Sequence, residues 1–172
     1  MERYKPLLNE KNLLNKTKKR DSQKEFKECI NLLSTMSMSM RKYIDRILKG
    51  NLDISLKEAT ETGRRVLATF EDAKKKLNDR IDNLDVIDKP LDVTKANNIT
   101  TLQNRNTHNF YKIIEALDNK RREISHQLDN EDKTVVRNMW SEYIESIEEM
   151  NSKIKIHNDN YPTHKINLLV FQ

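Results

Sequence analysis

Glu123 and His126 are the residues whose types and spacing could do chemistry of a specific kind. A Glu-x-x-His pair places a carboxylate and an imidazole on one helix face, and di-metal bundles combine two such pairs with two further carboxylates. The other histidines, His108, His157 and His164, have no glutamate three residues before them. We therefore expect neither a metal centre nor another cofactor.

The same segment contains a second pattern, an arginine and a histidine separated by four residues: Arg121 and His126. This pattern resembles the Arg-x4-His motif of the HEPN family, small all-helical bundles that often cut RNA without a metal. The resemblance implies that Arg121 would hold the scissile phosphate and that His126 would act as acid or base on the ribose 2′-hydroxyl. It covers this segment alone, and the polar residue that usually follows the arginine is Arg122 here. A solvated, charged helix face is the alternative interpretation of these residues.

The sequence gives no sign of a phosphate-binding loop, a disulfide or a membrane span. The two glycines, Gly50 and Gly63, cannot form a glycine-rich phosphate loop. The single cysteine, Cys29, excludes an intrachain disulfide and lies on an apolar helix position, where we expect a small buried hydrophobe. No run approaches the roughly 20 apolar residues of a membrane span. We therefore expect a soluble intracellular protein, cytoplasmic by default, with the nucleus left open.

Four stretches of the chain carry apolar residues at helical spacing, which is typical of helices packed side by side. The stripes are Phe26, Cys29, Leu33, Met36, Met40, Tyr43 and Ile47; Leu56, Ala59, Gly63, Val66, Phe70, Ala73, Leu77, Ile81 and Leu84; Phe110, Ile113, Leu117, Ile124 and Leu128; and Val136, Trp140, Tyr143, Ile147, Met150 and Ile154. They predict an all-α fold with helices at about 22–49, 55–87, 100–128 and 133–158.

The connections between these helices are short, which favours an antiparallel four-helix bundle with coiled-coil-like seams over residues 21–160. Ser22 and Glu25 form a capping box at the first start, and Pro90 must follow the end of the second helix. The rival arrangement is a pair of long helical hairpins that associate with another chain.

Basic charge is concentrated in an N-terminal arm, residues 1–20, where seven bases face two acids. The bases are Arg3, Lys5, Lys11, Lys16, Lys18, Lys19 and Arg20. The rest of the chain holds equal numbers of basic and acidic residues, so the net charge of +5 belongs to the arm. Leucines within the arm would make it amphipathic when helical, and an anionic surface of a nucleic acid or a membrane is then a possible partner. A frayed, solubilising tail is the alternative.

The C-terminal tail, residues 161–172, ends in an apolar run that includes Leu168, Leu169 and Phe171. Such a run is unusual in a soluble monomer unless it is packed. We expect the tail to pack against its own helices, and the alternative is an anchor for a partner.

The sequence therefore predicts a non-catalytic scaffold or adaptor. This interaction or assembly subunit would bind a protein partner, or form a homo-oligomer, through its helix surface and terminal segments, with no evident small-molecule substrate. A metal-independent ribonuclease using Arg121 and His126 is one alternative. Binding of a nucleic acid or an anionic membrane through residues 3–20 is the other.

Overall fold

The computed structural model describes residues 21–49, 56–119 and 130–171. These residues form four α-helices and one short 3₁₀ helix, with no strand among them, and this confirms the predicted all-α fold. The elements are α2 (Ser22–Lys49), α3 (Leu56–Ile81), η1 (Asp82–Val86), α4 (Val93–Asn119) and α6 (Asn130–Asn160).

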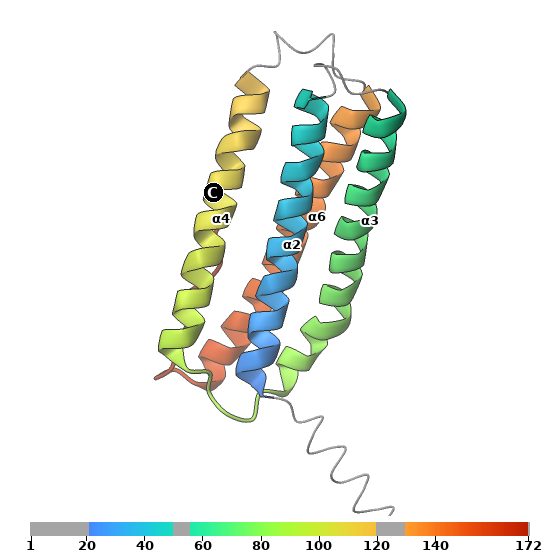
Figure 1. Ribbon diagram of the computed structural model, residues 1–172. Helices are drawn as coiled ribbons and strands as arrows, with labels where there is room; N and C mark the ends of the chain where they lie inside the picture. The colour runs from blue at the N-terminus through green and yellow to red at the C-terminus, as the bar shows by residue number, and fades with distance from the viewer. Residues whose placement is uncertain (1–20, 50–55, 120–129, 172) are drawn as a thin grey trace, which may run out of the picture.

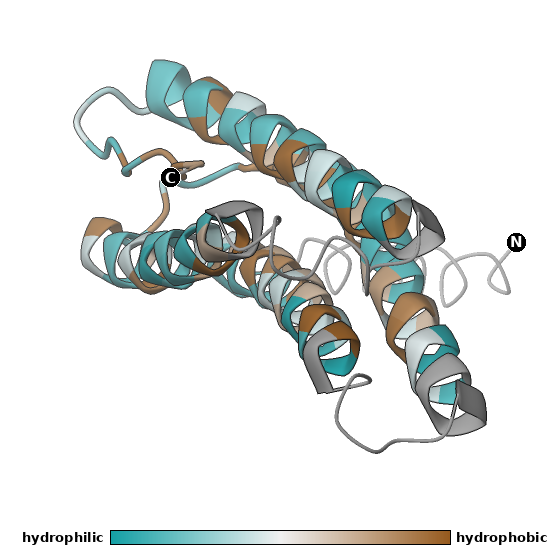
Figure 2. Ribbon diagram, turned by 90° about the horizontal axis from the view of Figure 1, so that it is seen from above, coloured by the Kyte–Doolittle hydropathy of each residue, from teal (hydrophilic) through white to brown (hydrophobic). Residues whose placement is uncertain are grey.

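The helices lie side by side, and successive helices run in opposite directions (Figure 1). Helix α2 contacts α3, α4 and α6, so it is the central helix of the fold. Seen from above, apolar and polar positions alternate along each helix, as expected of helices that bury one face (Figure 2).

The core follows the stripes that the sequence predicts. Every residue of the first stripe, from Phe26 to Ile47, is buried, with exposed fractions between 0% and 6%. The described part of the second stripe is buried as well, from Val66 to Leu84. In the fourth stripe, burial is complete from Tyr143 onwards, whereas Trp140 is only half-buried.

The boundaries of the first two helices agree with the predictions, but their details differ. Helix α2 begins as expected, yet its cap is Asp21, whose carboxylate accepts a hydrogen bond from the backbone N–H of Gln23 at 3.1 Å. The second predicted helix, 55–87, consists of α3 and η1, because its last turn tightens into a 3₁₀ helix. An ion pair between Lys153 and Asp85, at 2.6 Å, joins this turn to α6.

Helix α4 begins at Val93, and the predicted start near residue 100 is wrong. Asp92 is the missed N-cap, because its carboxylate accepts the backbone N–H of Lys95 at 3.1 Å. The N–H of Asp92 itself donates to the side-chain oxygen of Gln23 on α2, at 3.0 Å. A residue distant in sequence therefore holds the cap in place. The predicted continuation of this helix to 128 lies outside the described residues.

Helix α6 is slightly longer than the predicted 133–158. Among the described residues, no Cα atom of α4 lies within 8 Å of a Cα atom of α6. Large side chains fill the space at one end, where the rings of Phe110 and Trp140 lie 5.7 Å apart. No described helix has the length and apolar character to cross a membrane.

Candidate functional site

The C-terminal segment fills the space between α4 and α6 at the end opposite the contact of Phe110 with Trp140. After α6, a turn closes with the N–H of His164 donating to the carbonyl of Tyr161 at 2.9 Å. The chain then runs alongside α4 (Figure 1), and residues 166–170 bond to both helices. Ile166 and Leu169 are buried, with exposed fractions of 4% and 3%. The expectation that the tail packs against its own helices is thus confirmed.

Two asparagines hold the beginning of this segment. The side chain of Asn158 on α6 bonds to both polar groups of the Ile166 backbone, accepting its N–H at 2.9 Å and donating to its carbonyl at 3.0 Å. On the opposite side, the oxygen of Asn97 on α4 accepts the N–H of Asn167 at 2.9 Å. The segment is therefore held by its backbone from both helices.

A second pair of asparagines repeats this arrangement. Asn151 on α6 accepts the N–H of Leu169 at 2.8 Å and donates to its carbonyl at 3.0 Å. Asn104 on α4 accepts the N–H of Val170 at 2.9 Å and donates to the carbonyl of Leu168 at 3.3 Å. Because one amide supplies both a donor and an acceptor, each asparagine can replace part of a neighbouring strand.

The spacing of the asparagines matches the repeat of an extended chain. On each helix the two asparagines are seven residues apart, which corresponds to a rise of about 10.5 Å. Three extended residues, the separation of Ile166 and Leu169, span about 10 Å. We call Asn97, Asn104, Asn151 and Asn158 the tail site. Its geometry selects an extended backbone with apolar side chains three residues apart.

A buried histidine orients one member of the tail site. The ring of His157 is 2% exposed, and its Nε2 atom accepts the backbone N–H of Leu91 at 3.0 Å. The ring proton is therefore on Nδ1, which donates to the side-chain oxygen of Asn158 at 3.1 Å. This contact fixes the direction of the Asn158 amide. It also links the tail site to the connection between η1 and α4.

A buried network of hydrogen bonds, separate from the tail site, joins α2, α4 and α6. The hydroxyl of Tyr143 accepts a hydrogen bond from Gln103 Nε2 and shares one with the hydroxyl of Thr107, both at 2.7 Å. Ser34 on α2 donates to Gln103 Oε1 at 2.6 Å. Burial raises the pKa of the Tyr143 hydroxyl, and the bonds to Thr107 and Gln103 partly oppose this shift. A neutral phenol is thus the favoured form at physiological pH.

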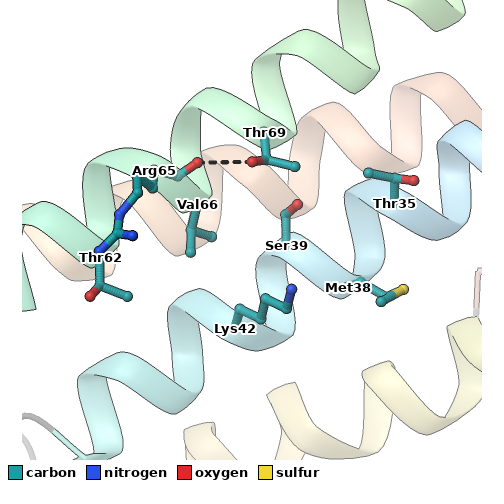
Figure 3. A pocket seen from close by; sticks show the side chains of 8 residues that line it. All are labelled: Thr35, Met38, Ser39, Lys42, Thr62, Arg65, Val66 and Thr69. Atoms are coloured by element: carbon teal, nitrogen blue, oxygen red, sulfur yellow. Dashed lines mark hydrogen bonds between the residues drawn. The ribbon is translucent and has the colours of Figure 1, made fainter.

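A pocket of about 330 Å³ lies between α2 and α3 (Figure 3). Lys42 and Arg65 are exposed at its rim, while Val66 and Ser39 are buried. Cationic and hydroxyl side chains such as those of this pocket are the groups that bind anions in proteins. However, two of its threonines already donate their hydroxyls within their own helices, Thr35 to the carbonyl of Asn31 and Thr69 to the carbonyl of Arg65, both at 3.0 Å. We therefore assign no ligand to it.

Cys29 is fully buried and carries no reactive thiolate at neutral pH. Its exposed fraction is 0%, as predicted for a small core residue. Burial, with a smaller contribution from the charge of Glu25, raises the pKa of the thiol to about 12. Within the described residues, no three His, Cys, Asp or Glu side chains gather in a group that could hold a metal ion.

The structure places only part of the predicted site residues. Glu123, Arg121, His126 and the basic arm 1–20 lie outside the described residues, so the metal, ribonuclease and anion-binding hypotheses stay predictions.

The C-terminal candidates are described. Leu168 and Phe171 are 40% and 37% exposed, whereas Leu169 is buried against the tail site and is not available to a partner in this arrangement.

Sequence reasoning missed the tail site altogether. Asparagines are poor helix formers, so helix propensity gives no sign that Asn97 and Asn104 lie within a helix. The signal that could have revealed them is their spacing, a pair seven residues apart on each of two helices. Comparison of the chain with protein-family models, curated proteins and solved structures finds no match.

Proposed function

We propose that this protein is an interaction or assembly subunit that binds a protein partner through its C-terminal segment and the adjoining helix surface. The observation that carries the proposal is a set of exposed apolar side chains on a backbone that the tail site holds in place. Leu168, Val170 and Phe171 are 40%, 43% and 37% exposed. Large apolar side chains that cluster on an ordered surface commonly mark a contact with another molecule.

The rigid support of this segment favours binding. Association costs less conformational entropy when the contact residues are already ordered, and the asparagine bonds supply that order. Residues 21–172 hold equal numbers of basic and acidic residues, so apolar contact rather than net charge would select the partner. An intracellular location is part of this proposal, supported by the unpaired thiol of Cys29.

The test compares exposed apolar residues inside and outside the segment. Wild-type protein and the double variant Leu168→Ser/Phe171→Ser are immobilised, and a protein captured by the wild type is purified for affinity measurement. We expect the double variant to bind it at least about tenfold more weakly, the equivalent of about 1.4 kcal/mol.

The matched control is Met38→Ser/Leu102→Ser, because both side chains are exposed, at 57% and 58%. Met38 lies on α2, and Leu102, two residues from Asn104, lies on the face of α4 opposite the tail site. This control should keep wild-type affinity. Equal affinity of the Leu168→Ser/Phe171→Ser variant and the wild type for every captured protein would contradict the proposal.

A further inference from the structure

We infer that the tail site also holds the C-terminal segment of a second copy, so that two copies exchange residues 166–170. This inference rests on the assembly part of the proposed function, since it names a second copy of the chain as the partner, and it does not depend on the exposed side chains of the segment. Each copy would contribute its segment to the tail site of the other, and each site would remain filled.

The contacts between the tail site and the segment do not depend on which copy supplies the segment. Every hydrogen bond between the tail site and the segment goes to a backbone atom of the segment, so these bonds fit any extended chain of the right spacing. Side-chain selectivity comes from the two buried positions, Ile166 and Leu169. A segment that meets these requirements is present on every copy of the chain.

The connection between α6 and the segment is short and exposed to solvent. Residues 162–165 are all exposed, and the first three of them lie in the turn that the His164–Tyr161 backbone bond closes. Straightening this connection would carry the segment away from its own helices while leaving every tail-site contact available to be remade on another copy. Exchange of an identical element is a low-cost route to a dimer for this reason.

A second copy fits the tail site at a lower cost than a foreign peptide. A foreign peptide would displace the native segment and leave Ile166 and Leu169 exposed to water. Reciprocal exchange buries these side chains in both copies, and its main cost is the association of two chains. A second copy is therefore the favoured occupant.

The experiment uses two full-length variants with complementary defects. Ile166→Asp/Leu169→Asp releases the segment and leaves an intact, empty tail site. Asn104→Leu/Asn151→Leu removes hydrogen bonds from the tail site and leaves an intact segment; leucine is also a better helix former than asparagine. We expect each variant alone to be monomeric and their equimolar mixture to form a heterodimer in size-exclusion chromatography with light scattering.

The matched controls carry the same chemical changes on exposed side chains. Leu168→Asp/Val170→Asp should keep its segment in its own site, and so should Asn98→Leu/Asn138→Leu, whose asparagines are exposed. Replacing either defective variant by its control should leave the mixture monomeric at the same concentration. Heterodimers in the control mixtures would show association elsewhere and would overturn the inference.

Circular dichroism establishes that both defective variants are folded. If they are helical and their mixture stays monomeric, the inference is overturned. If either variant is unfolded, the wild type decides, because the attached segment competes at an effective concentration of about 1 mM. If the wild type forms a dimer near that concentration, and Leu168→Asp/Val170→Asp forms it too, exchange is supported. If the wild type is a monomer at that concentration, the inference is overturned.

The two proposals can fail separately. A monomeric mixture together with a captured protein that needs Leu168 and Phe171 would refute the exchange and leave the proposed function standing. A heterodimer together with unchanged capture by Leu168→Ser/Phe171→Ser would leave the exchange standing and refute the outward apolar face as a binding surface.

Discussion

Replacing Tyr143 by phenylalanine tests the buried network at the centre of the fold. The substitution keeps the ring and removes a hydroxyl that bonds to Gln103 and Thr107 at 2.7 Å. Thr107 can turn its hydroxyl to a carbonyl of its own helix, as Ser and Thr often do. The Nε2 group of Gln103, which is 1% exposed, loses its partner. One orphaned buried donor costs about 1–3 kcal/mol, so we expect Tyr143→Phe to lose this much stability.

A double-mutant cycle separates the hydrogen bond from general packing. Gln103→Leu in the Tyr143→Phe background removes the orphaned donor itself, so the double variant should lose less stability than the two single variants together. We expect a coupling of about 1 kcal/mol, measured by urea unfolding followed by circular dichroism. Tyr111→Phe is the matched control, because its ring also packs on Trp140 but its hydroxyl makes no hydrogen bond within the described residues. It should change stability by less than about 0.5 kcal/mol.

The pH dependence gives an independent check on the same residue. The folded-state pKa of Tyr143 is raised above its ordinary value of 10.0. The unfolded state therefore loses this proton first, so stability should fall as the pH rises above 10, and less steeply in Tyr143→Phe. Our reasoning is refuted if Tyr143→Phe matches Tyr111→Phe in stability and the cycle is additive.

Three further predictions concern other parts of the molecule. Leu33→Ala should cost about 2–5 kcal/mol in urea unfolding, because the side chain is 0% exposed; a loss below about 0.5 kcal/mol would contradict its central position. Cys29 should react with iodoacetamide at pH 8 only as fast as the protein unfolds, and rapid labelling of the folded protein would disprove its burial. Because the folded state raises the pKa of this thiol, the free energy of unfolding should decline as the pH rises from 9.0 to about 12, and Cys29→Ala should remove this decline. Purified protein should leave RNA intact in EDTA; cleavage that disappears in Arg121→Ala and in His126→Ala would establish the ribonuclease alternative instead.

The helical spacing of apolar residues was sufficient to predict α2 and most of the helices that pack against it. The stripe from Phe26 to Ile47 keeps helical spacing without interruption, and all of it is buried. Such a pattern is local, because the face that a helix buries depends on residues three and four positions apart. The same stripes predicted the all-α fold class, whereas capping residues predicted the start of α2 at Ser22.

The third helix shows where periodicity was insufficient. Its buried face continues through Thr100, Gln103 and Thr107, which a search for apolar residues passes over. These side chains can be buried because partners on other helices satisfy them, as Tyr143 satisfies Gln103. The described part of the stripe predicted from Phe110 onwards therefore covers only the C-terminal part of α4.

The sequence by itself determined that apolar stripes would form helices, because helical spacing is a property of neighbouring residues. Only the tertiary structure decided what the asparagines do. Asn97 meets Asn167 across 70 residues of chain, and Asn104 meets Val170 across 66. An amide that is unfavourable within an isolated helix becomes favourable when an extended segment supplies its hydrogen-bond partners. Those partners come from folding, and no local pattern in the chain specifies them.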